Sequence, residues 1–141
     1  MTEMENISAY IIENTEPLNL NISFLNVSGS KEFPFMLVVK SATEECIRLT
    51  IYPIEKEKII KMLFTGIEVT ENFIEILSKI LEEIKIIHTS GLLKKGESFN
   101  YECYLNLNKS DIKYKDLIAS IAKIRYIFKE IIIDEIGLKK A

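Results

Sequence analysis

The order of apolar patterns in the second half of the chain limits the possible folds more than any other feature of the sequence. Residues 70–84 and 111–126 repeat apolar side chains with the 3.6-residue period of an amphipathic helix. Residues 84–93, 99–107 and 129–135 instead have the length and the Ile and aromatic content that are typical of strands. We expect a core that contains Leu77, Ile80, Ile84, Phe99, Tyr101, Leu117, Ile121 and Ile132.

Residues 55–67 fit either a short helix or a strand. Apolar residues between 59 and 64 would line one face of a helix, but the same stretch also reads as a strand that ends at Gly66. The strand is favoured for the second half of this segment. Residues 54–141 then follow the order strand–helix–strand–strand–helix–strand, with residues 94–97 as a hairpin turn. This order is typical of the ferredoxin-like plait, in which two helices cover one face of an antiparallel sheet.

Residues 1–53 predict a β-meander that extends this sheet or forms a small second one. Residues 18–25 alternate apolar and polar side chains, and residues 47–52 do the same before Pro53 ends the strand. Between them, the turn residues at 28–31 precede a strand at Phe35–Val39.

At the N-terminus, Thr2 and Glu5 have the spacing of a capping box. The first residues therefore fit a short helix, with a frayed terminus as the alternative. Taken together, the patterns predict one α+β domain, residues 1–141, in which an N-terminal segment and meander (1–53) precede a ferredoxin-like half (54–141).

The strand Phe35–Val39 is the main reason to expect self-association. Phe35, Leu37 and Val39 point one way, and Met36 and Val38 point the other way. Because a strand in a two-layer domain needs only one apolar face, something must cover both sides. A partner subunit in a two-fold dimer is one cover, and the N-terminal helix is the alternative.

The second half resembles the ACT domain, a regulatory module that binds small molecules and usually dimerises. The resemblance covers residues 70–133: a helix ending in Leu81-Glu82-Glu83-Ile84, a hairpin, a second helix through Leu117–Ile124 and a closing Ile-rich strand. It implies a regulatory role with a small ligand. At the position of the ligand loop, the chain has Thr65-Gly66-Ile67-Glu68 without the usual Asp-x-Pro-Gly arrangement.

A second resemblance, to the RNA recognition motif, rests on residues 63–71 and on three aromatic residues, Phe99, Tyr101 and Tyr104. In that family, aromatic side chains of a central strand face the solvent. Here, exposing Phe99 and Tyr101 would turn Glu102 and its polar neighbours towards the helices, which is costly. We therefore expect Phe99 and Tyr101 in the core and no RNA-binding sheet.

Charge and cysteine content exclude several classes of protein. A net charge of −3, with Arg48 and Arg125 as the only arginines, lacks the positive field of a duplex-binding protein. The N-terminal residues do not read as a secretory signal, so we expect a cytoplasmic protein. Cys46 and Cys103 do not form a CxxC pair and are expected to be reduced and buried.

No residue pattern identifies a catalytic, cofactor-binding or metal site. His88 is the only histidine and has no sequence-adjacent triad partner, and one histidine cannot build a typical zinc site. Asp134 and Glu135 have the chemistry to bind a cation, but residues that close a strand are more often solvated. A basic neighbourhood surrounds the second helix, formed by Lys109, Lys113, Lys115, Lys123, Arg125 and Lys129.

The sequence therefore predicts a non-enzymatic regulatory or scaffolding module that self-associates through a sheet edge or face, with a capacity to bind a small ligand and no cofactor. Two alternatives remain open: a nucleic-acid-associated protein that uses the Lys-rich second helix, and a small enzyme that uses His88.

Overall fold

The computed structural model describes residues 6–13, 33–66, 71–96 and 98–138. Contacts between these residues divide the chain into two compact units, one within Lys58–Ile136 and the other within Glu3–Glu57 and Gly137–Ala141. The boundary after Glu57 lies close to the junction predicted after Pro53. The elements are α-helices and antiparallel strands, so the predicted α+β class is confirmed.

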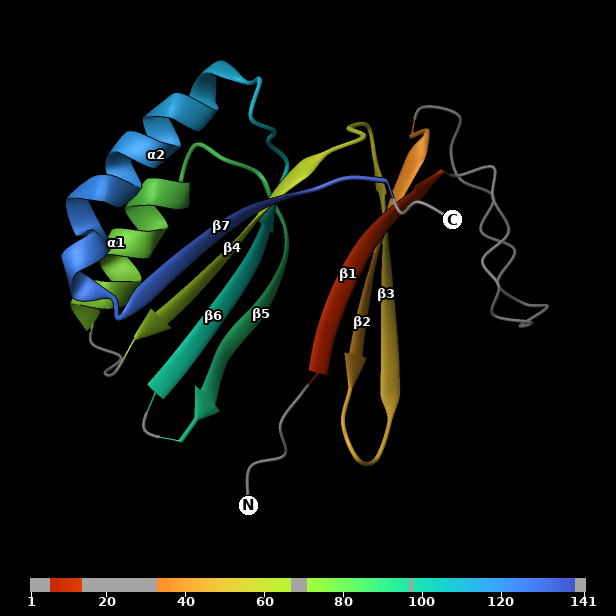
Figure 1. Cartoon of the computed structure of the whole chain (residues 1–141), viewed down its shortest axis with the longest axis horizontal. Helices are drawn as coiled ribbons and strands as arrows, with labels where there is room; N and C mark the ends of the chain where they lie inside the picture. The colour runs from red at the N-terminus through yellow and green to blue at the C-terminus, as the bar shows by residue number, and fades with distance from the viewer. Residues whose placement is uncertain (1–5, 14–32, 67–70, 97, 139–141) are drawn as a thin grey trace. The chain divides into compact units, whose positions relative to one another are not determined.

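The unit within 58–136 contains a four-stranded sheet with the strand order β5-β6-β4-β7, and each neighbouring pair is antiparallel. Both helices lie on one face of this sheet (Figure 1). The element bounds are β4 (Ile59–Gly66), α1 (Glu71–Leu81), β5 (Ile86–Lys95), β6 (Ser98–Leu105), α2 (Ile112–Ile124), a 3-10 turn (Arg125–Ile127) and β7 (Glu130–Ile136). The strand prediction for the second half of 55–67 is therefore confirmed, and both helices end earlier than predicted.

The β5–β6 hairpin turns at Gly96, whose φ of 65° lies in the left-handed region. Residues with a Cβ atom adopt this conformation at a cost, whereas glycine does so readily. The predicted turn at 94–97 therefore has a residue suited to its backbone.

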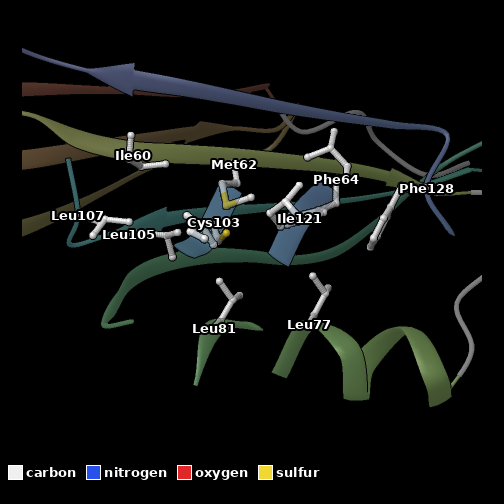
Figure 2. Close-up of a cluster of buried hydrophobic side chains, with 12 residues drawn as sticks. Ile60, Met62, Phe64, Leu77, Leu81, Cys103, Leu105, Leu107, Ile121 and Phe128 are labelled. Atoms are coloured by element: carbon white, nitrogen blue, oxygen red, sulfur yellow. The ribbon is translucent and has the colours of Figure 1, made fainter. Parts of the chain in front are cut away.

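The core of this unit lies between the sheet and the two helices. Figure 2 shows Leu77 and Leu81 of α1 pointing towards the strand residues Met62 and Cys103. Phe64 packs against Phe128, with ring centroids 5.0 Å apart. The buried members of the core are Ile60, Met62, Phe64, Leu77, Leu81, Cys103, Leu105, Leu107, Leu117, Ile121, Phe128 and Ile131.

Most of the predicted core is confirmed, but Ile132 is not. Leu77, Leu117 and Ile121 are buried. Partly buried side chains of Ile80, Ile84 and Tyr101 pack against the same cluster, and Phe99 is half-buried. The prediction for Ile132 is wrong: it is 38% exposed because Ile131 takes the core-facing position opposite Phe64.

The second unit contains a three-stranded antiparallel sheet in the order β1-β2-β3. Its strands are β1 (Asn6–Glu13), β2 (Phe35–Ala42) and β3 (Ile47–Ile54). Pro53 does not end β3, since it lies within the strand opposite Met36. On a strand with one neighbour, the missing N–H of proline need not cost a ladder hydrogen bond. The predicted strand at 18–25 and the turn at 28–31 lie outside the described residues.

The predicted N-terminal helix is wrong over the described residues, because 6–13 form strand β1. This strand pairs with β2 along its whole length, from Asn6 opposite Ala42 to Glu13 opposite Phe35. An isolated bridge also joins Ile11 to Leu138. Strand pairing that buries Ile11 completely outweighs the weak helical preference of so short a segment.

Both faces of β2 are inaccessible within a single chain. Met36 and Val38 pack with Tyr10, Leu49 and Ile51 of the neighbouring strands. On the other face, Leu37 and Val39 are also buried. The expectation that both faces are covered is confirmed. Met36 and Val38 are each at most 2% exposed.

Candidate functional site

The face of the four-stranded sheet opposite the helices has a row of polar side chains that crosses all four strands. Lys61 of β4 lies opposite both Tyr104 of β6 and Asp134 of β7, and His88 of β5 lies opposite Tyr104. Since successive strand residues point to opposite faces, Tyr101, Cys103 and Leu105 face the helices while Glu102 and Tyr104 face away. The predicted orientation of β6 is therefore confirmed by the core packing of Tyr101 and Cys103.

A nearly buried ion pair lies within this row. The Nζ atom of Lys61 is 2.6 Å from Oε1 of Glu102. Glu102 is 7% exposed, and its backbone N–H donates a hydrogen bond to Oγ of Ser90. A carboxylate with so little water around it needs a cation or several donors, and Lys61 supplies the cation.

Tyr104 is completely buried beside this pair. Within the described part of the chain, its hydroxyl group has no hydrogen-bond partner. Burial and the nearby charge of Glu102 raise the pKa of the phenol well above its usual value, so Tyr104 is neutral at all physiological pH values. Its ring lies 5.8 Å from the His88 ring, and the Lys61 ammonium is 6.0 Å from its centroid.

Cys103 and His88, the candidate nucleophile and the candidate general base, lie on opposite faces of the sheet. Cys103 lies in the core on the helix side of the sheet, whereas His88 contacts Tyr104 on the other side. Burial, followed by the charge of Glu102, raises the pKa of the Cys103 thiol to about 12. Because the thiolate is the nucleophilic form, Cys103 is unreactive at neutral pH.

The prediction that both cysteines are buried is correct for Cys103 and wrong for Cys46, which is exposed. Cys46 ends a tight turn between β2 and β3. In this turn, Oγ1 of Thr43 accepts hydrogen bonds from the backbone N–H groups of Glu45 and Cys46, at 3.3 and 3.2 Å. Threonine often begins a turn of this kind, so Thr43 is the sequence feature that could have predicted an exposed Cys46.

Asp134 and Glu135 do not form a common cation site. Adjacent residues of β7 point to opposite faces, and the Glu135 carboxylate accepts a hydrogen bond of 2.9 Å from the Lys109 backbone N–H. Among the described residues, no three His, Cys, Asp or Glu side chains are grouped so that they could hold a metal ion.

The basic residues around α2 are exposed. The Lys113 ammonium donates to the Glu83 carbonyl at 3.3 Å, near the end of α1. The Arg125 guanidinium reaches the Ile131 carbonyl at 3.5 Å. Two of the predicted cations thus contribute to the fold of their own unit.

A groove of about 320 Å³ lies between α1 and α2. Its apolar lining comes from Ile80, Ile84 and Leu117, and its rim carries charges of both signs. The rim residues are Lys79, Glu82, Glu83, Lys113, Asp116 and Ser120. This volume is at the lower end of the range for small-molecule sites. In the segment 65–68, which is compared above with the ACT ligand loop, residues 67 and 68 lie outside the described residues.

The outer face of α2 departs from the pattern of an ordinary amphipathic helix. We use this name for the exposed residues Ile112, Lys115, Asp116, Ala119, Ala122, Lys123 and Tyr126, the last of which lies in the 3-10 turn after the helix. Ile112 is 87% exposed and Tyr126 is 85% exposed. The sequence contains a signal for this face, because neither residue belongs to the inward stripe of Leu117 and Ile121.

Comparisons with known proteins do not assign the chain to a family. No protein-family profile matches the sequence, and the curated proteins include no significant match. Neither helix in the described ranges has the length and apolar character that crossing a membrane requires.

Proposed function

We propose that this chain is a non-enzymatic scaffolding or regulatory module that works by self-association. The observation that carries the proposal is the outer face of α2, where Ile112 and Tyr126 are almost fully exposed. A helix that packs on a sheet normally has polar residues on its solvent side. Here Ile112 and Tyr126 lie at the two ends of the face. Ala119 and Ala122, which lie between them, are also exposed to solvent. A second protein surface would remove Ile112, Tyr126 and these two alanines from water.

The chemical state of the buried groups supports a non-enzymatic role. The thiol of Cys103 and the phenol of Tyr104 hold their protons at neutral pH, and the Glu102 carboxylate is paired with Lys61. Active sites more often shift pKa values towards the working pH, so that groups can gain and lose protons. The pKa values of Cys103 and Tyr104 are shifted away from such a state.

We also propose that residues 58–136 form a ferredoxin-like plait. The support is the strand order β5-β6-β4-β7 with both helices on one face of the sheet. This architecture serves many functions, so it provides a scaffold for α2 without specifying an activity.

Light scattering over a dilution series tests self-association. We expect a mass above the 16.3 kDa of one chain at high concentration, falling towards that value on dilution. The double variant Ile112→Asp/Tyr126→Asp should remain at the mass of one chain throughout. Ile47→Asp is the matched control, because Ile47 is 65% exposed but lies on β3. A wild-type chain that is monomeric at about 1 mM would refute the proposal, since a weaker dimer would fall outside ordinary affinities.

The nucleic-acid alternative has a separate readout in the same preparations. Binding through Lys109, Lys115 and Lys123 would weaken steeply as salt concentration rises, because displaced counterions drive such binding. If wild-type chain binds single-stranded RNA with this salt dependence while remaining monomeric, the nucleic-acid role replaces the scaffolding role.

The groove between α1 and α2 supports a second role, the binding of a small ligand with both charges. Lys79 and Lys113 on the rim would face an anionic group, and Glu82 and Asp116 would face a cationic group. A thermal-shift screen with amino acids and related zwitterions tests this role, because ligand bound to the folded state raises its melting temperature. A shift that Lys79→Ala abolishes would locate the ligand in the groove.

A further inference from the structure

We infer that two copies of this chain pair through the outer faces of their α2 helices in an antiparallel arrangement, with the two-fold axis near Ala119. The inference rests on the proposed function and adds the geometry of the contact. Its evidence is the spacing of apolar, small and charged residues along one exposed helix face.

The apolar residues of this face recur at a seven-residue interval. Ile112 and Ala119 are seven residues apart on α2, which is close to two helical turns, so they lie on one side of the helix. Tyr126 follows seven residues later, in the 3-10 turn that continues α2. All three are exposed. A two-fold antiparallel pair centred on Ala119 places Ile112 beside Tyr126 of the partner subunit, and the same contact forms a second time by symmetry.

Small residues at the centre allow the helices to approach closely. Ala119 and Ala122 lie between the two large apolar residues and are exposed. In an antiparallel pair, Lys115 lies across from the partner's Ala122. Its aliphatic stem can cover that alanine while the ammonium remains in water.

Charge distinguishes the antiparallel arrangement from a parallel one. Asp116 and Lys123 are seven residues apart on the same flank of the face, and both are exposed. Asp116 is three residues before Ala119 and Lys123 is four residues after it. The antiparallel pair therefore places Asp116 beside Lys123 of the partner subunit, and does so twice. In a parallel pair with matching register, Asp116 and the partner's Lys123 would lie about two turns apart.

The size of the contact indicates a weak dimer. A helix of 13 residues is about 20 Å long, so one helix pair buries less than the roughly 800 Å² per subunit of a standard interface. We therefore expect a reversible dimer whose mass depends on concentration, rather than an obligate one.

Reversing single charges in the full-length chain tests the antiparallel pairing of the two α2 helices. Asp116→Lys gives two like-charged contacts in its own homodimer, and Lys123→Asp does the same with the opposite sign. We expect each variant alone to associate at least about ten-fold more weakly than wild type, within the range measured for like charges forced together at an interface. A one-to-one mixture of the two variants should form a heterodimer, because both contacts then join Lys to Asp.

The double variant Asp116→Lys/Lys123→Asp should recover homodimers for the same reason. Charge-matched controls are Glu75→Lys on α1 and Lys109→Asp in the turn before α2, both at exposed positions away from the outer face. Native mass spectrometry separates homodimers from heterodimers if one variant carries a short tag, and circular dichroism verifies that each variant is folded.

The outcomes separate this inference from the proposed function. If wild type is monomeric at every concentration, both are refuted. If wild type dimerises but neither charge reversal weakens it more than the matched controls do, self-association stands and the α2 pairing is refuted. If the single variants dissociate but their mixture does not form heterodimers, the antiparallel arrangement is refuted.

Discussion

Lys61 and Glu102 form an ion pair of 2.6 Å on the face of the four-stranded sheet that points away from the helices. The two residues lie directly on neighbouring strands, since β4 and β6 pair with Lys61 opposite Tyr104 and Leu63 opposite Glu102. Glu102 is nearly buried, whereas the Lys61 side chain is 26% exposed. The pair therefore compensates a buried negative charge with a cation that can still reach water.

Replacing Lys61 should cost more stability than replacing both partners. Lys61→Met leaves the Glu102 carboxylate buried without its cation, and we expect a loss of about 2–3 kcal/mol in the free energy of unfolding. This is below the usual cost of breaking a fully buried pair because Lys61 is partly exposed. Urea denaturation of Lys61→Met, Glu102→Gln and the double variant measures the coupling. Additive losses would mean that the two side chains do not stabilise each other.

The two cysteines should differ sharply in reactivity. Cys46 is exposed, whereas Cys103 is buried and has a thiol pKa of about 12. A thiol reagent at pH 8 should therefore modify one cysteine per folded chain and two in denaturant, and Cys46→Ser should abolish the reaction of the folded chain. Rapid modification of Cys103 in folded Cys46→Ser would contradict the burial of this thiol.

The same shift predicts how stability depends on alkaline pH. The ordinary thiol pKa of 9.0 is raised to about 12 in the folded chain, so the unfolded chain loses its proton first as pH rises. The contribution of Cys103 is fully present below pH 9 and is lost between about pH 9 and 12. Cys103→Ala should lower stability at pH 7, and its stability should decline less than that of wild type over this alkaline range. Parallel slopes for the two proteins would contradict the assignment.

Leu77 and Ile132 provide a matched pair for testing the core. Leu77 points from α1 into the core (Figure 2) and is 6% exposed. Ile132 is 38% exposed. Leu77→Ala should lower the free energy of unfolding by about 2–5 kcal/mol, because it removes buried methyl groups and leaves a cavity. Ile132→Ala should cost clearly less. A loss below about 1 kcal/mol for Leu77→Ala would remove α1 from the core.

The contrast between β6 and β7 explains which parts of the fold could be predicted. In β6, apolar and polar residues alternate, so the sequence alone assigns Tyr101 and Cys103 to the helix side. Ile131, Ile132 and Ile133 form a uniform run in β7, which has no alternation to show which face is buried. The correct face becomes clear only from the pairing of Ile131 with Phe64.

The N-terminal strand and the polar row depend on contacts between distant parts of the sequence. Ile7 and Ile11 fit the spacing of a helix, but they also fit one face of a strand, and pairing with β2 decides between the two. Lys61 and Glu102 come together because β4 and β6 pair in one particular register. The apolar–polar pattern within one strand does not show which residues of another strand lie opposite it. Neither the ion pair nor the position of Tyr104 beside it could therefore be predicted from the sequence.

The hydroxyl group of Tyr104 should reduce stability rather than contribute to it. It is buried and has no hydrogen-bond partner among the described residues, and a buried polar group in that state costs about 1–3 kcal/mol. Tyr104→Phe removes the hydroxyl and keeps the ring contact with His88, whose centroid lies 5.8 Å away. We therefore expect this variant to be more stable than wild type by about 1 kcal/mol in urea denaturation. Tyr126→Phe is the control, because Tyr126 is 85% exposed and its hydroxyl can bond to water, so its stability should not change. A Tyr104→Phe variant that is less stable than wild type would mean that the hydroxyl has a partner in the folded protein, either the nearby Glu102 carboxylate or a bound water molecule.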